Sequence, residues 1–308
     1  MSDLPPLFLE RLKQIIPPQH RESVLRTFEQ EKTFGLRINT LKTSKEEVIK
    51  NFQAQGVEFS PCDWYQDALF LNGKSRELIE PLLKQGHIYL QSPSSMLTVC
   101  LFDPQPDERI LDMCAAPGSK TSQMASLMRN TGQIVCIEPI KSRYYQLKAV
   151  CALLGVQNAS FKMIDGRRFR AEELFDKVLV DAPCSCEARF QKSNPKTYGF
   201  WSARKIKEMR KKQKGLLLNA SRALRPGGVL LYATCTFAPE ENEEVVGWVL
   251  RKSDGKLKLT PVDLKDVKIY PSPKGWGKKT FNPQVRHGVR ILPDERMEGF
   301  FVAKFIKC

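Results

Sequence analysis

The chain has 308 residues, of which 42% are hydrophobic, and it carries a formal net charge of +15 with a pI of about 9.4. This length suits one large domain plus one small domain, and the basic excess favours nucleic acid as a partner. The sequence contains no run of about 18 apolar residues that would predict a membrane span, and its N-terminus lacks a signal-peptide pattern. We therefore expect a cytoplasmic protein without a membrane segment, and we expect it to be monomeric.

The nine cysteines are odd in number and irregularly spaced, which argues against a disulfide framework and for a reducing compartment. Cys184 and Cys186 form the one close pair, and the three histidines are isolated in the sequence. No metal site is expected, because structural zinc sites use paired ligands at defined spacing. Cys114, Cys136 and Cys151 lie in apolar patterns and are expected to be small buried hydrophobes.

Residues 1–85 are predicted to form a small α+β module with helices at its start. The pair Pro17-Pro18 is expected to end the first helix, because proline lacks the amide hydrogen that a helix interior requires. Ser44 and Gly56 are expected to cap a later helix at its two ends. In chain order, the predicted elements are helices over residues 1–30, a strand over 34–41, a helix over 44–56 and further strand over 57–71.

From residue 86 to 308 strands and helices alternate, which predicts an α/β domain with a doubly wound, mostly parallel sheet. In such a sheet the carboxyl ends of the strands face the ligand crevice, so residues at those ends are candidates for the functional site. The predicted strands are 108–113, 132–139, 159–165, 176–181, 227–233 and 299–306, and the predicted helices are 119–130, 142–155, 203–225 and 239–252.

The segment LDMCAAPGSK (residues 111–120) places a glycine turn between the first strand of this domain and a helix. It is neither a GxGxxG motif nor a P-loop. The small residues Ala115, Ala116 and Gly118 nevertheless allow backbone amides to approach a ligand closely, and Ser119 is expected to cap the helix. The turn is therefore a candidate cofactor site.

Acidic residues end the next three strands, at Glu138, Asp165 and Asp181. Glu138 lies roughly 20 residues after the glycine turn, where a carboxylate takes the ribose hydroxyls of an adenosine-bearing cofactor. These residues leave a nicotinamide dinucleotide and S-adenosylmethionine open as ligands. The missing diphosphate fingerprint disfavours the dinucleotide, whereas Asp181 and the backbone near Cys114 could hold the amino acid moiety of S-adenosylmethionine.

Two cysteines follow short apolar runs that predict buried strands: Cys184 in VDAPCS and Cys235 in YATCT. Both thiols are expected to open onto one pocket, because both strands end at the same edge of the sheet. Two thiols and the carboxylate of Asp181 suit cytosine C5 methylation, in which a thiolate adds to C6 and makes C5 nucleophilic. No histidine lies near either cysteine in the sequence, which disfavours a Cys/His hydrolase.

These motifs resemble the Sun-type (RsmB/RsmF-like) family of RNA cytosine-5 methyltransferases over nearly the whole chain. LDMCAAPGSKT resembles the cofactor motif of the family, DAPCS its fourth motif, TCT its sixth and QSPSSML the start of its catalytic domain. FGLRINTLK resembles the segment that opens its small RNA-binding module. The resemblance implies an RRM-like RNA-binding module over residues 1–85 and a Rossmann-like class I methyltransferase domain over residues 86–308. It also implies S-adenosylmethionine as cofactor and rRNA or tRNA as substrate.

The resemblance further implies a role for each residue of these motifs. Cys235 is the nucleophile that attacks C6, and Cys184 assists release by helping to remove the C5 proton. Asp181 binds or protonates the pyrimidine edge, and Lys120 reaches the catalytic centre. The residues implied to line the S-adenosylmethionine pocket are Cys114, Ala115, Ala116, Pro117, Gly118, Ser119, Lys120, Glu138, Arg143, Asp165 and Asp181.

The chain departs from the family where PCSGEG is usual, because it reads PCSCEARF and has Cys186 and Ala188 in place of two glycines. A side chain at Cys186 would narrow the base pocket or alter the loop. This departure supports an alternative interpretation, a catalytically inactive RNA-binding assembly factor. A DNA cytosine-5 methyltransferase is a third interpretation, although those enzymes use the Pro-Cys thiol as nucleophile and the Thr-Cys thiol here favours RNA.

The target base must leave its stack, or already be unpaired, to reach the thiols. Trp276 with its flanking lysines is a candidate surface for stacking. The candidate RNA-contacting residues are Arg167, Arg168 and Arg170, then Arg204, Lys205, Lys207, Arg210, Lys211 and Lys212, and finally Arg37, Asn39 and Lys42 in the small module.

Overall fold

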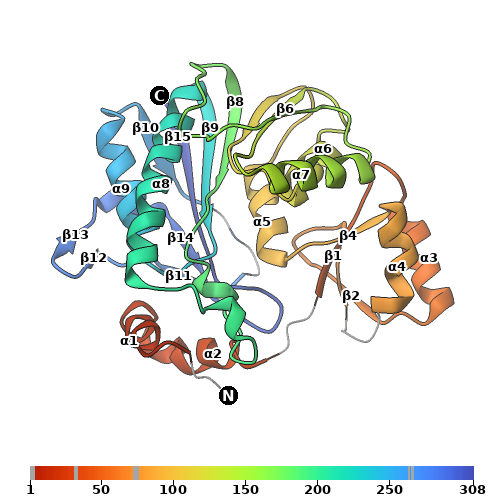
Figure 1. The fold of residues 1–308 in the computed structure, drawn as a ribbon, viewed down its shortest axis with the longest axis horizontal. Coiled ribbons are helices and arrows are strands. Elements are labelled where there is room, and N and C mark those ends of the chain that lie inside the picture. Colours follow the sequence, from red (N-terminus) through yellow and green to blue (C-terminus); the bar gives the residue numbers. More distant parts are fainter. Residues whose placement is uncertain (1–3, 31–33, 72–75, 263, 265–266) are drawn as a thin grey trace.

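The computed structural model describes residues 4–30, 34–71, 76–262, 264 and 267–308. Two sheets organise the chain (Figure 1). The smaller sheet is antiparallel with the order β2-β3-β1-β4, and the larger sheet has nine strands with a parallel centre. The predicted combination of a doubly wound, mostly parallel sheet with a small α+β module is thereby confirmed.

The smaller sheet is built from β1 (Phe34–Ile38), β2 (Phe59–Pro61), β3 (Ala68–Leu71) and β4 (Ile88–Leu90). Helices α3 (Lys45–Gln55) and α4 (Arg76–Gln85) pack on it through apolar side chains. The predicted caps of α3 are confirmed, because the Ser44 side chain accepts a hydrogen bond from the Glu47 amide and Gly56 is left-handed with φ of 67°. Since β4 pairs with β1, the small sheet extends past residue 85.

The centre of the larger sheet consists of parallel strands in the order β7-β6-β5-β8-β9. β15 joins β9 in the antiparallel direction, and β14, β11 and β10 continue the sheet beyond it. The later strands β10 to β14 were not predicted, because two to four residues are too few for a period to show. The strands are β5 (Arg109–Asp112), β6 (Gln133–Ile137), β7 (Ala159–Lys162), β8 (Phe175–Asp181), β9 (Leu224–Thr234), β10 (Leu257–Thr260), β11 (Ile269–Pro271), β14 (Val289–Ile291) and β15 (Phe300–Lys307), with β12 (Gly275–Trp276) and β13 (Lys279–Thr280) forming a separate hairpin.

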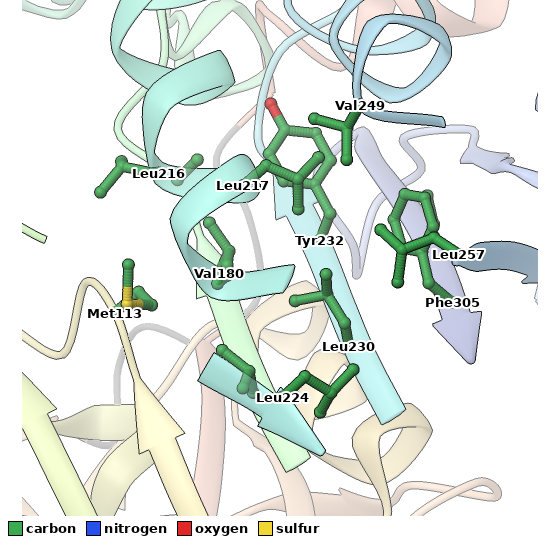
Figure 2. Packing of buried hydrophobic residues seen from close by; sticks show 14 of the residues in the cluster. Met113, Val180, Leu216, Leu217, Leu224, Leu230, Tyr232, Val249, Leu257 and Phe305 are labelled. Atoms are coloured by element: carbon green, nitrogen blue, oxygen red, sulfur yellow. The ribbon is translucent and has the colours of Figure 1, made fainter. Parts of the chain in front are cut away.

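Helices cover both faces of the larger sheet. α5 (Pro93–Phe102), α6 (Ser119–Leu127) and α7 (Lys141–Leu153) pack on one face, and α8 (Ala203–Ala223) and α9 (Glu243–Lys252) pack on the other. Successive residues of β9 alternate between the two layers, as the pleat of a strand requires. Figure 2 shows Leu217 of α8 and Val249 of α9 beside Tyr232 of β9. Cys136 and Cys151 lie in the opposite layer as the buried hydrophobes expected from the sequence.

The N-terminal helices α1 (Pro6–Ile15) and α2 (Arg21–Arg26) pack on the large domain. The ring of Phe8 lies 4.8 Å from that of Phe190 between their centroids. Figure 1 shows both helices beneath the large domain and apart from the small sheet. α1 ends before the Pro17-Pro18 pair, as predicted. These helices therefore cover loops of the large domain instead of joining the small module.

Among the described residues, short 3-10 turns lie in loops of the large domain at η3 (Glu187–Arg189), η4 (Pro195–Thr197) and η5 (Pro283–His287), and η1 (Pro18–His20) links α1 to α2. Within the described ranges, no helix combines the length and the apolar character that crossing a membrane requires.

Candidate active site

The carboxyl ends of β5, β6, β8 and β9 open onto one cavity of about 860 Å³. This volume falls in the range of small-molecule and cofactor sites. As the strand ends predicted, Cys184, Cys235 and Asp181 line the same cavity. The expected cofactor residues that also line it are Cys114, Ala115, Ala116, Pro117, Ser119, Lys120, Glu138, Arg143 and Asp165.

Gly118 shapes the turn after β5 but packs toward α7 instead of lining the cavity. Its φ is 109°, and a Cβ at this position would lie 3.2 Å from the side chains of Leu147 and Val150. The expected helix cap by Ser119 is wrong. Gly118 itself is the N-cap of α6, no side chain caps this helix, and Ser119 already belongs to its first turn. The amides at the start of α6 therefore carry no side-chain cap.

Asp112, at the end of β5, stabilises the turn between β5 and α6. Its Oδ2 accepts a hydrogen bond from the Thr121 hydroxyl at 2.9 Å, and its Oδ1 accepts one from the Cys114 amide at 3.4 Å. Burial raises the pKa of this carboxyl to about 6. No role was predicted for Asp112, because an acid inside a strand pattern is read as part of the strand.

Arginines hold two of the acids expected at the cofactor site. Glu138 is 2% exposed, and its Oε2 lies 3.4 Å from Nη1 of Arg143. Nη2 of Arg143 donates to the carbonyl of Ala116 at 2.9 Å, so this arginine ties the end of β6 to the turn after β5. Asp165 accepts hydrogen bonds from Arg167, and these lower the pKa of Asp165. Arg167, a candidate for RNA contact, is thus engaged within the protein.

Lys120 reaches the catalytic end of the cavity, as expected. Its Nζ lies 2.6 Å from Oδ2 of Asp181 and donates to the hydroxyl of Ser95 at 2.8 Å. The side chain of Lys120 is 9% exposed and that of Asp181 is 29% exposed, so the carboxylate is the part of the pair that remains open to a ligand. Ser95 was missed because its segment lies 25 residues away in the chain.

The two predicted catalytic thiols lie side by side, with 3.4 Å between Sγ of Cys184 and Sγ of Cys235. Cys184 follows β8 and Cys235 follows β9, and these two strands are neighbours in the parallel sheet. Arg189, which had not been predicted as a site residue, lines the same cavity and adds a positive charge beside the thiols. The arrangement therefore combines nucleophiles, a cation and a paired carboxylate at one end of a ligand-sized cavity.

Comparisons with known proteins agree with this geometry. Residues 99–306 match the family model described as 16S rRNA methyltransferase RsmB/F, and residues 4–93 match the N-terminal domain of 16S rRNA methyltransferase RsmF. The chain belongs to the RsmB/F family. It is an S-adenosylmethionine-dependent RNA cytosine-C5 methyltransferase, and the interpretation drawn from the two cysteine motifs is confirmed.

Curated relatives of this RsmB/F-family chain act on two kinds of RNA. The tRNA (cytosine(49)-C(5))-methyltransferase of Pyrococcus abyssi is 40% identical over 89% of this chain and 88% of that protein. The human 28S rRNA (cytosine(4447)-C(5))-methyltransferase is 35% identical over 97% of this chain and 37% of its own length. Ribosomal RNA small subunit methyltransferase F of Pectobacterium carotovorum is 36% identical over 80% of this chain and 53% of its own. The chain thus spans most of the archaeal relative but about half or less of the other two.

Solved structures show the same fold. A methyltransferase homologue from Pyrococcus horikoshii has a TM-score of 0.77 at 29% identity, covering 99% of this chain and 100% of that one. NSun6 from Pyrococcus horikoshii, solved with SFG, has a TM-score of 0.81 at 22% identity over 98% of each chain, and it supports the fold alone.

Cys186 occupies the position where this family usually has a glycine, and the backbone explains that usage. Its φ is 57°, in the left-handed region that favours glycine. Its Sγ lies 3.9 Å from Sγ of Cys184 and Cys186 lines the cavity, so this departure adds a third thiol to the site. Ala188, the other departure, is 1% exposed and lies in the cluster with α1 and α2.

Hydrogen bonds among the three thiols shift their pKa values. Hydrogen bonds from Cys184 and Cys235 lower the pKa of Cys186, and the bond to Cys186 is the largest cause that raises the pKa of Cys184. The positive charge of Arg189 also lowers the pKa of Cys186. One negative charge is therefore favoured in this cluster, and it belongs to the set of thiols rather than to one residue.

Buried polar side chains beneath the thiols join the two cysteine loops. Ser185 and Thr236 each follow a catalytic cysteine, and their hydroxyl oxygens lie 2.7 Å apart. The Ser185 amide donates to Glu241 at 3.0 Å, and the Thr236 hydroxyl donates to Glu187 at 2.9 Å. Both glutamates are buried, and burial raises the pKa of Glu241 to about 8. The sequence predicted no role for either glutamate, because the network joins segments that are far apart in the chain.

Several residues expected to contact RNA instead join the small module to the large domain. Arg37 is fully buried and donates to Gln91, Ser122 and Ser126. The side-chain amide of Asn39 donates to carbonyls at Gly86 and Leu154, and Nζ of Lys42 donates to carbonyls at Gln85 and Leu153. The prediction of RNA contact is wrong for Arg37 and Asn39, because their polar groups are buried and satisfied inside the protein.

Trp276 is also engaged within the protein. Its Nε1 donates to Glu240 at 2.9 Å, and the guanidinium of Arg11 lies 5.1 Å from the ring centroid. On α8, by contrast, Arg204, Lys207 and Lys211 are exposed at spacings that place them on one helix face. Their contact with RNA stays a prediction.

Proposed function

We propose that this chain methylates C5 of cytosine through a transient covalent bond between Cys235 and C6 of the base. The observation that carries the proposal is the 3.4 Å separation of two thiols at the mouth of a cofactor-sized cavity. As a thiolate, Cys235 adds to C6, which moves electron density toward C5 and N3. Asp181, held by Lys120, is well placed to contact the N3 edge where that charge develops.

The cavity suits S-adenosylmethionine. Its volume, the carboxylate of Glu138 at the end of β6 and the backbone of residues 114–119 fit a ribose and an amino acid moiety. When bound, this cofactor supplies an electrophilic methyl group to C5. Arg143 and Asp112 act indirectly by fixing the turn that borders the ligand.

Release of the product requires that C5 lose its proton. Cys184 lies beside Cys235, so after its own proton has passed to solvent it can accept the C5 proton while the Cys235–C6 bond breaks and Cys235 leaves as a thiolate. Each turnover then consumes one methyl group and releases one proton, and both thiols return to their starting states. The two cysteines thus carry opposite halves of the cycle, addition for Cys235 and elimination for Cys184.

Single cysteine variants test this division of roles. Cys235→Ala should reduce methyl transfer to background and form no adduct, whereas Cys184→Ala should accumulate an RNA–protein adduct that survives a denaturing gel. Cys308→Ala, at an exposed position, is the matched control and should behave as the wild type. An adduct that requires Cys184 and persists without Cys235 would reverse the roles, and full turnover by both variants would refute covalent catalysis.

We further propose tRNA as the substrate. The tRNA methyltransferase of Pyrococcus abyssi is 40% identical to this chain, whereas the two rRNA methyltransferases named above are 35–36% identical to it. Bisulfite sequencing of total RNA from a strain lacking the protein should lose a 5-methylcytosine in tRNA. Loss of an rRNA signal instead would contradict this choice.

The proposal extends to the small module, for which we infer a role in RNA binding. Tyr89 and Leu90, from its last strand, line the cavity, so RNA entering the site passes this sheet. We place the functional limit of the module after Leu90, because β4 completes its sheet. We also propose that the enzyme acts as a monomer and that it acts in the cytoplasm, where a reducing environment would preserve its nine free thiols.

A further inference from the structure

Three sulfur atoms meet at the catalytic end of the cavity. The Sγ atoms of Cys184, Cys186 and Cys235 all lie within 4.8 Å of one another. The sequence had predicted no metal site, because it offers no paired ligands at zinc spacing. That prediction considered ligands close in sequence, whereas the third sulfur comes from the neighbouring strand β9, 51 residues after Cys184.

The spacing of the sulfurs matches what a tetrahedral thiolate site requires. A Zn–S bond of about 2.3 Å in tetrahedral geometry places the sulfurs about 3.8 Å apart. The sulfur atoms lie 3.4 Å apart in Cys184 and Cys235 and 3.9 Å apart in Cys184 and Cys186. All three residues line the cavity, so the fourth position of such an ion would face open space and could hold water.

The local charge also suits a thiolate-bound divalent ion. Three thiolates and one divalent cation leave a net charge of −1, and the guanidinium of Arg189 lies near the sulfurs to balance it. Soft thiolate ligands select zinc and similar ions over magnesium or calcium. Each thiol that binds releases its proton to solvent.

We propose that Cys184, Cys186 and Cys235 form a binding site for a thiophilic metal ion such as Zn²⁺, and that its occupancy blocks methyl transfer. The block follows because the ion takes both thiols to which the proposed function assigns the chemistry. Cys186 is the residue that makes the site, since a chain with glycine at this position would offer two sulfurs and bind the ion weakly. Metal binding itself does not depend on the catalytic roles.

The probe is Co²⁺, added to the full chain under anaerobic conditions with a phosphine reductant. We expect thiolate-to-cobalt charge-transfer absorption that saturates at one ion per chain and disappears when Zn²⁺ is added. Cys186→Gly should lower the affinity for Zn²⁺, measured against a chelating dye, by roughly 100-fold or more. Folding of this variant is secure, because glycine adopts the φ of 57° without strain. Cys308→Ala should bind as the wild type does.

Methyl transfer is measured in parallel. Zn²⁺ should inhibit the wild type stoichiometrically, and Cys186→Gly should require far more Zn²⁺ for the same inhibition. No charge-transfer absorption, or equal zinc affinity in the wild type and Cys186→Gly, would overturn the inference. If the wild type binds cobalt at these thiols but metal-free Cys184→Ala forms no covalent adduct with RNA, the proposed function is refuted and the metal site stands.

Discussion

The buried carboxyl of Glu241 makes the stability of the protein depend on pH. Its pKa rises from 4.5 to about 8 because burial disfavours the charged form. At about 1.4 kcal/mol for each pKa unit, ionising Glu241 costs the folded chain roughly 5 kcal/mol more than it costs the unfolded chain, which is an upper limit. We test this with Glu241→Gln, which has the same size and does not titrate.

The sign follows from proton binding. Between pH 4.5 and about 8 the folded state keeps a proton on Glu241 that the unfolded state has lost, so stability falls as pH rises through this range. Below pH 4.5 the contribution is constant, and above about 8 it is constant again. Glu241→Gln lacks this loss, so its stability should improve relative to wild type by a few kcal/mol between pH 5 and pH 8.5.

Urea unfolding at a series of pH values measures the difference between the two proteins. Glu208→Gln is the control, because Glu208 is exposed on α8, and the hydrogen bond from Lys212 lowers the pKa of this carboxyl. That residue is ionised in both states from pH 5 upward, so its variant should parallel the wild type. A difference between wild type and Glu241→Gln that stays flat with pH would refute the reasoning.

Three further variants probe other contacts. Lys120→Met leaves Asp181 without its cation, and we expect single-turnover methyl transfer to fall by roughly 100-fold while RNA binding by filter retention is kept. Arg290→Met breaks a salt bridge to Glu243 in which both side chains are at most 1% exposed, and urea unfolding should reveal a loss of about 3–5 kcal/mol. Glu138→Gln should raise the KM for S-adenosylmethionine roughly tenfold, with little change in the melting temperature.

Sequence patterns predicted those parts of the fold that depend on local periodicity. Alternating strands and helices predicted the parallel sheet, and strand ends predicted that Cys184 and Cys235 share a cavity. The partners of these residues could not be predicted, because Ser95 and Glu241 reach the site from segments whose distance a sequence does not encode. Arg37 was assigned to RNA because its charge suggested a solvent-facing role, whereas acceptors from two other elements satisfy it in the interior.

The interior hydrogen bonds of Arg37 and Asn39 limit how far the two domains can move when RNA binds. The buried guanidinium of Arg37 links β1 to α6. Rotation of the small sheet relative to the large one would break its hydrogen bonds and leave a buried cation without partners, which is energetically costly. We therefore expect the small module and the large domain to keep a fixed relative orientation. We therefore expect the RNA, and not the protein, to bend or unstack so that a cytosine reaches the sulfurs.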